Sequence, residues 1–155
     1  NASGWILDYV TILPEKLHGE RENWINHVRV PVEADVEYRF IKAIQIAWQV
    51  TGDDEWVKKL LPNMEKAIEY ITTDEYRWDP DKKLVKRALT IDTWDFDYTA
   101  GKHEWLNFDF SPDTFWGIMH GDNSGYYEAM KTIAFFHNYF GNIEKAESYQ
   151  KWLTN

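Results

Sequence analysis

The chain has 155 residues, of which 44% are hydrophobic and 28% charged, and its net charge is −9 at pH 7. This composition predicts one globular domain, and an acidic balance without a basic stripe argues against nucleic acid as a partner. The absence of cysteine excludes disulfides, cysteine-ligated zinc and thiol catalysis, and no apolar run approaches the ~18 residues of a membrane span.

The N-terminal part is expected to be irregular, and a first helix follows it. Residues 1–32 contain a short strand candidate at 5–13 and are broken by proline and glycine. Acidic side chains in the next segment suit the start of a helix, where the helix dipole favours negative charge. We predict a helix over 33–51, because apolar side chains recur there at helical spacing, at Val36, Phe40, Ala43, Ile44, Ala47 and Val50.

A second helix is predicted over residues 55–72, directly after a short break. Gly52 suits the left-handed residue that ends many helices, and Asp53 or Asp54 suits the cap that begins the next one. Pro62 lies inside this segment, where it would kink the helix or open a new first turn. The two helices and the tight break between them predict a first helical hairpin over 33–73.

Residues 74–121 differ in pattern from the helices on either side. Two short runs, 76–78 and 84–87, flank the turn-like sequence Asp79-Pro80-Asp81-Lys82, which predicts a small β-hairpin. Residues 93–121 are expected to be mostly loop, rich in acidic and aromatic side chains. A loop of this length within a compact domain is usually functional.

A second helical hairpin is predicted over 122–155. One helix is expected from about 123 to 140, and a final helix from 143 to about 153. The two hairpins share a pattern, because the same separation in sequence relates Ile44 to Ile133 and Gly52 to Gly141. This pattern predicts a helical-hairpin repeat, although any two amphipathic hairpins with glycine at the break would look alike.

Acids and aromatic rings alternate in the segment between the hairpins. Asp92, Asp95 and Asp97 lie close together in the sequence and are separated by aromatic residues that include Trp94. Flat rings stack on the apolar faces of pyranoses, and carboxylates accept hydrogen bonds from sugar hydroxyls or transfer protons. The segment therefore predicts a sugar-binding cleft, with turn formation or solvated charge as the alternative for any one acid.

Further candidates for sugar binding surround this segment. Rings for stacking are available at Trp94, Trp116 and Tyr126. Core packing is the alternative explanation for each of these rings. His120, Asp122 and Asn123 are candidates for binding sugar hydroxyls from a helix start, where Asp122 or Asn123 would also cap the helix.

Four stretches of the chain share a wider pattern. They are Glu33-Ala34-Asp35 at a helix start, the break at 47–53, the acid-and-tryptophan loop at 90–95 and the polar stretch at 119–124. Together they resemble the six-hairpin, (α/α)6-toroid glycoside hydrolases, which include glucoamylase-like, trehalase-like, rhamnosidase-like and glycogen-debranching enzymes. The resemblance extends over roughly residues 31–155.

The resemblance implies a mainly α fold that forms part of a toroid with an inner ring of helices. Asp35 would then point into the lumen and join the substrate-binding residues. A full toroid has twelve helices and needs roughly 200 residues or more, so the chain is expected to be a fragment with two hairpins of six. Its exposed helix faces would be covered by the remainder of the catalytic domain or by self-association.

The resemblance also implies hydrolysis of a glycosidic bond, mostly with inversion, by two carboxyl groups roughly 6.5–9.5 Å apart. Asp95 is the first candidate for the catalytic acid, because desolvation by the ring of Trp94 would raise its pKa. Asp92 and Asp97 are close rivals, and the second carboxylate is not identified. The expected partner is an oligosaccharide or a glycoside, with no metal and no cofactor.

Two other classes of function stay open. One is a helical-repeat interaction module or sugar-binding module without catalysis, in which the rings pack in the core and the acids are solvated. The other is a toroid-type sugar epimerase, for which His120 would be the proton shuttle. No signal peptide is visible, which favours the cytoplasm, with secretion open for a processed fragment.

Overall fold

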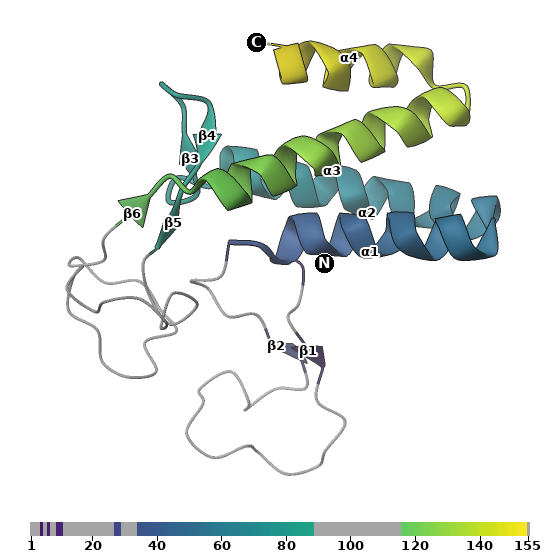
Figure 1. Cartoon of the computed structure of the whole chain (residues 1–155), viewed down its shortest axis with the longest axis horizontal. Coiled ribbons are helices and arrows are strands. Elements are labelled where there is room, and N and C mark those ends of the chain that lie inside the picture. The colour runs from purple at the N-terminus through teal and green to yellow at the C-terminus, as the bar shows by residue number, and fades with distance from the viewer. Residues whose placement is uncertain are drawn as a thin grey trace.

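The computed structural model describes Gly4, Ile6, residues 9–10 and 27–28, and the two continuous stretches 34–88 and 116–154. These residues form four helices and three pairs of short antiparallel strands (Figure 1). The predicted mainly α class is confirmed. None of the helices in this described part combines the length and the apolarity of a membrane span.

The first hairpin consists of α1 (Val36–Thr51) and α2 (Asp54–Thr73). Gly52 ends α1 in a left-handed conformation, with a φ of 66°. Asp53 then caps α2 by accepting a hydrogen bond from the Trp56 N–H at 2.9 Å. The predicted break and cap are therefore confirmed in these residues.

Two details of the first hairpin differ from the expectation. α1 begins at Val36 rather than at residue 33, because Asp35 is its N-cap. Pro62 lies inside a continuous α2 and does not divide it. The proline is exposed, so the carbonyl that loses an N–H partner can bond water instead.

The second hairpin consists of α3 (His120–Tyr139) and α4 (Ile143–Thr154). α3 begins before residue 123, and its N-cap is Met119, which makes no side-chain cap hydrogen bond. The prediction that Asp122 or Asn123 caps this helix is therefore wrong. Both lie inside the first turns of α3, and their side chains contact β5 and β4 respectively.

The short strands lie between and before the hairpins. β3 (Trp78–Asp79) pairs with β4 (Leu84–Val85), which confirms the predicted β-hairpin. Near the N-terminus, β1 (Tyr9–Val10) pairs with β2 (His27–Val28). The first of these strands falls within the strand predicted over residues 5–13.

The remaining strand pair corrects the predicted loop. β5 (Arg87–Ala88) pairs with β6 (Trp116–Gly117) in antiparallel register. The loop expected over 93–121 is therefore wrong at its C-terminal end, where β6 and the start of α3 take its place. The pairing also brings together the residues on either side of the segment 89–115.

The two hairpins lie side by side with α1 parallel to α3 (Figure 1). Contacts between the two helices join N-terminal end to N-terminal end and C-terminal end to C-terminal end. The Tyr126 hydroxyl bonds Ala34 O near their N-terminal ends, and the Trp48 ring meets the Phe136 ring near their C-terminal ends. α2 and α4 run the opposite way, and α2 also packs on α3. The N-terminal ends of α1 and α3 therefore meet at one end of the molecule.

Matching residues of the two hairpins occupy matching places. Ile44 of α1 and Ile133 of α3 are both buried in the core. Gly52 and Gly141, which follow the same two helices, both have a left-handed φ, of 66° and 84°. A left-handed glycine at the same point of each hairpin produces the same reversal, as the repeat pattern in the sequence predicts.

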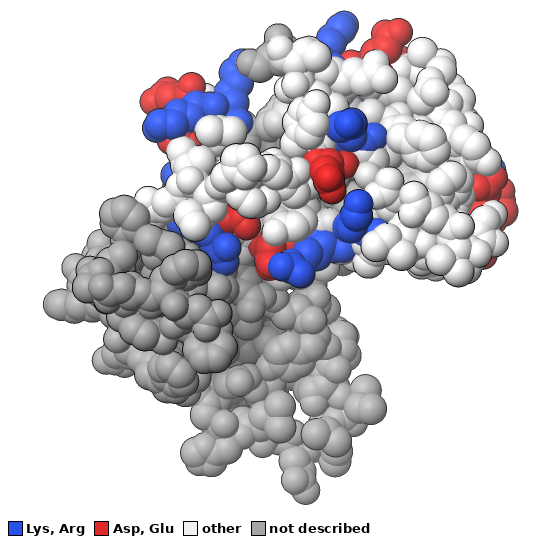
Figure 2. Space-filling model, in the orientation of Figure 1, with Lys and Arg blue, Asp and Glu red and all other residues white. Residues whose placement is uncertain are grey.

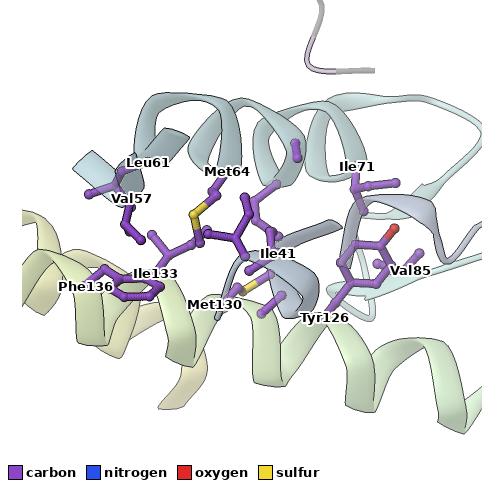
Figure 3. Close-up of a cluster of buried hydrophobic side chains, with 14 residues drawn as sticks. Ile41, Val57, Leu61, Met64, Ile71, Val85, Tyr126, Met130, Ile133 and Phe136 are labelled. Atoms are coloured by element: carbon purple, nitrogen blue, oxygen red, sulfur yellow. The ribbon is translucent and has the colours of Figure 1, made fainter. Parts of the chain in front are cut away.

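The hydrophobic core fills the space between α1, α2 and α3 (Figure 3). Ile41 of α1, Met64 of α2 and Ile133 of α3 are each fully buried. Burial of such a side chain contributes about 1.5–3 kcal/mol. Val85 of β4 and Tyr126 of α3 extend the core toward the strands, so the same core that joins the hairpins also fixes the end of the molecule where the strands lie.

Candidate functional site

Charged and aromatic side chains gather where the N-terminal ends of α1 and α3 meet β5 and β6. The free N–H groups and dipoles of two parallel helices favour negative charge at this end. Figure 2 shows acidic and basic side chains next to one another along the border of the described residues. Most of the predicted substrate-binding residues lie at this end, namely Asp35, Trp116, His120, Asp122, Asn123 and Tyr126.

Asp122 is the most deeply buried of these acids, with 3% of its surface exposed. Its Oδ2 lies 3.5 Å from Nη1 of Arg87 and accepts no hydrogen bond from the described part of the chain. Desolvation raises the pKa of this carboxyl, and Arg87 lowers it to a smaller extent. The net shift favours the protonated form, which is the property that a general acid needs.

Glu37 is a second buried carboxyl, in the first turn of α1. The Ile6 N–H approaches its Oε1 at 3.4 Å, and the Tyr126 hydroxyl approaches its Oε2 at 3.5 Å. It was not predicted as a site residue. A signal for it exists in the sequence, because Glu37 shares the helical face of Ile41 and Ile44 and so falls on the buried stripe.

Tyr126 joins the starts of the two parallel helices. Its hydroxyl donates to Ala34 O at 2.5 Å, and its ring packs edge-on against Tyr38 with centroids 5.1 Å apart. Only 2% of Tyr126 is exposed. The ring therefore lies in the core, and within the site Tyr126 can position Glu37 more directly than it can stack on a ligand.

Asp35 and Arg39 form an ion pair at the start of α1. The Arg39 Nε donates to Asp35 Oδ2 at 2.5 Å, and Asp35 is half-buried. The negative charge of Asp35 raises the pKa of Arg39. Burial, followed by the charges of Asp35 and Asp122, also raises the pKa of the neighbouring Tyr38. Carboxylates of both hairpins thus contribute to the electrostatic potential at this end of α1.

Two arginines outside the predicted site residues balance these acids. Arg77 is fully buried, and its backbone N–H donates to Asp74 Oδ1 at 3.0 Å. Arg87 lies on β5 with a mostly buried side chain. Both lower the pKa of Asp122 and so oppose the effect of desolvation. The site therefore holds buried charges of both signs rather than an isolated acid.

Aromatic and polar groups form the edge of the site. The Trp116 ring stacks on Tyr76, with centroids 5.9 Å apart and planes 22° apart. His120 is exposed at the first position of α3, and its Nδ1 lies 3.5 Å from Ser124 Oγ. Trp116 is held on β6 by pairing with Ala88, next to Arg87, and His120 lies two residues before Asp122 on α3.

Asn123 connects α3 to the β-hairpin. Its Oδ1 accepts from the Val85 N–H at 2.8 Å, and its Nδ2 donates to Val85 O at 3.0 Å and to Met119 O at 2.9 Å. Both ends of the amide are therefore bonded to backbone. This arrangement fixes β4 against the first turns of α3 and so helps to hold Asp122 in place.

The predicted catalytic residues Asp92, Asp95 and Asp97, together with Trp94, lie outside the described residues. What the structure does describe is where their segment leaves and returns. Arg87 and Ala88 pair with Gly117 and Trp116 respectively, directly beside Asp122. Both attachment points of residues 89–115 are therefore part of the candidate site.

Within the described stretches, no group of three or more His, Asp or Glu side chains is arranged to hold a metal ion. No protein-family model, no curated protein and no solved structure matches this chain. The function is therefore inferred from the site itself.

Proposed function

We propose that this chain belongs to a carbohydrate-active enzyme that hydrolyses glycosidic bonds at the N-terminal ends of α1 and α3. The observation that carries the proposal is the burial of Asp122, whose pKa is raised by desolvation while Arg87 lies 3.5 Å away. A carboxyl with a raised pKa keeps its proton to a higher pH than usual, and it can protonate a leaving glycosidic oxygen.

Hydrolysis needs a second carboxylate. In this proposal Asp122 serves as the acid, and Asp95, Asp92 or Asp97 supplies the partner that activates water. The sequence resemblance implies inversion, for which the two carboxyl groups stand roughly 6.5–9.5 Å apart. Trp116 and His120 then contact the sugar at the edge of the site, through stacking and hydrogen bonding.

The arrangement of the helices supports a toroid-type scaffold. α1 and α3 run parallel side by side, and each is followed by an antiparallel helix packed against it. We propose that these are two of the six hairpins of an (α/α)6 toroid. Exposed apolar residues such as Val50, which is 81% exposed, would then contact the remainder of the catalytic domain or a second copy.

The proposal is tested by assaying release of reducing sugar from a panel of oligosaccharides and aryl glycosides. The wild-type chain is compared with Asp122→Asn and with Glu147→Gln, which changes an exposed acid on α4. We expect Asp122→Asn to lose at least about a hundredfold in rate, in the range of general acid catalysis, and Glu147→Gln to match the wild type. Binding of sugar without hydrolysis by any of the three proteins would instead identify a sugar-binding module.

A further inference from the structure

A cavity of about 530 Å³ lies on the other side of α3 from α1, between the β3–β4 hairpin and the C-terminal part of α4. In Figure 1 these two elements flank the same side of α3. Its size falls in the range of ~300–1,000 Å³ that small-molecule sites occupy. Its lining includes aromatic, aliphatic and cationic side chains, notably Trp78, Lys83, Leu84, Tyr127, Met130 and Trp152.

Two indole rings form one wall of the cavity. The Trp78 and Trp152 rings have centroids 5.2 Å apart and planes 37° apart, so together they make a continuous bent aromatic surface. Trp152 is 43% exposed and Tyr127 is 49% exposed, although both are large rings. Because much of the surface of these two rings is in contact with water, they are not core residues. They are suited to contact an amphipathic ligand.

Hydrogen-bond donors lie on the β-turn above these rings. Lys83 is exposed, while Lys82 donates to Asp79 Oδ2 at 2.9 Å. Asp79 offsets the charge of Lys82, and Asp81 lies on the same turn outside the lining of the cavity. The Lys83 ammonium is thus available to a ligand as a hydrogen-bond donor.

A second hollow of about 600 Å³ borders the first and extends toward the candidate acid site. Leu84, Asn123 and Tyr127 line both hollows. The second hollow also includes His120, at the edge of the acid site, and Lys131, whose ammonium lies 5.6 Å from the centroid of the Tyr127 ring. A groove therefore runs along α3 from His120 to the two tryptophans.

We propose that this groove binds a neutral oligosaccharide chain, with one pyranose over the Trp78–Trp152 surface and further sugar units extending toward His120. The choice of ligand rests on the proposed function. The chemistry fits because pyranose rings have apolar faces for the indoles, while their hydroxyls bond the Lys83 ammonium and the Tyr127 hydroxyl. None of the described acids of the candidate site lines the groove, and the bound chain extends as far as His120, two residues before Asp122.

The test is an NMR titration of the full chain with maltohexaose, cellohexaose and xylohexaose, observing the indole N–H signals. Trp→Phe variants assign the signals of Trp78 and Trp152. We expect both signals to shift with one of these sugars, and Trp152→Ala to weaken its binding about tenfold, equivalent to about 1.4 kcal/mol. Trp56→Ala is the matched control, because Trp56 is 38% exposed at the start of α2 and lies outside the groove.

The outcomes separate the groove from the hydrolytic site. Retained sugar binding by Asp122→Asn, with both indole signals still shifting, supports an independent groove whether or not hydrolysis is lost. Equal affinities of Trp152→Ala and Trp56→Ala would overturn the proposal. So would a titration in which none of the three sugars shifts the signals of Trp78 and Trp152, even if the chain hydrolyses glycosides.

Discussion

The guanidinium of Arg87 lies 3.5 Å from the carboxylate of Asp122, measured from Nη1 to Oδ2, and both side chains are largely buried. The pair joins the end of β5 to the first turn of α3. Residues 89–115, which contain the acidic and aromatic segment, begin directly after β5. The buried carboxyl of Asp122 is therefore fixed to the point where that segment leaves the scaffold.

At a pH where Asp122 is ionised, replacing Arg87 with methionine should destabilise the fold by about 3–5 kcal/mol, because the Asp122 charge would be left buried without its closest cation. The double variant Arg87→Met/Asp122→Asn should recover part of this loss, since the uncompensated charge is gone. Urea unfolding followed by circular dichroism measures both changes. Lys42→Met, which breaks the exposed pair with Glu128, serves as the control and should match the wild type.

The pH dependence of stability provides a second prediction about Asp122. Its pKa is raised above 3.8 in the folded chain, chiefly by desolvation. Its contribution to stability is therefore complete below 3.8 and is lost as the pH rises through the folded-state pKa. We predict that Asp122→Asn gains stability relative to the wild type as the pH rises from 3.8 through the folded-state pKa of Asp122. A difference in unfolding free energy that stays constant or shrinks over this range would contradict the raised pKa.

Tyr126 and Tyr127 are neighbours in sequence that should respond differently to the loss of a hydroxyl. Tyr126→Phe removes the donor to Ala34 O and leaves that buried carbonyl without this hydrogen bond. We expect a loss of about 1–3 kcal/mol in unfolding free energy. Tyr127→Phe alters an exposed ring and should have little effect on stability. Equal effects of the two substitutions in urea unfolding would show that the link between the starts of α1 and α3 is not important for the fold.

Gly125 and Gly121, both in the first turns of α3, should respond in opposite ways to replacement by alanine. A Cβ at Gly125 would lie 2.6 Å from Cε2 of Tyr38, so the Tyr38 ring would have to move away from its place against Tyr126. Gly125→Ala should therefore cost about 1–3 kcal/mol through overpacking. A Cβ at Gly121 meets nothing within 4 Å, and Gly121→Ala should stabilise the helix by about 0.5–1 kcal/mol. Thermal unfolding of both variants tests whether α1 and α3 pack as closely as this at their N-terminal ends.

The scaffold could be predicted from the sequence because its signals are local. Gly52 and Asp53 reverse the chain by backbone conformation and by capping, and each needs only its near neighbours. The start of α3 was missed for the opposite reason. Asn123 is a good cap by type, but its amide bonds Val85 on a strand far away in the sequence, and no local rule reports that contact.

The site was predictable only in part, because burial and charge pairing depend on how the elements pack. Asp122 was predicted from its position near a helix start, whereas the raised pKa follows from the helices and β5 that enclose it. The burial of Glu37 could be predicted from the sequence, because it lies on the same helical face as Ile41 and Ile44. Arg77 carries no such signal, because it lies in a turn, where no helical or strand period indicates which side chains are buried.

The most direct test of the account is real-time proton NMR of oligosaccharide hydrolysis by the wild-type chain and by Asp122→Asn. The account predicts anomeric signals of a product with the configuration opposite to that of the cleaved bond for the wild type, and no product signal for the variant. Equal hydrolysis by the two proteins, or a wild type that cleaves none of the sugars it binds, would contradict a hydrolytic role for the acids where α1 and α3 begin.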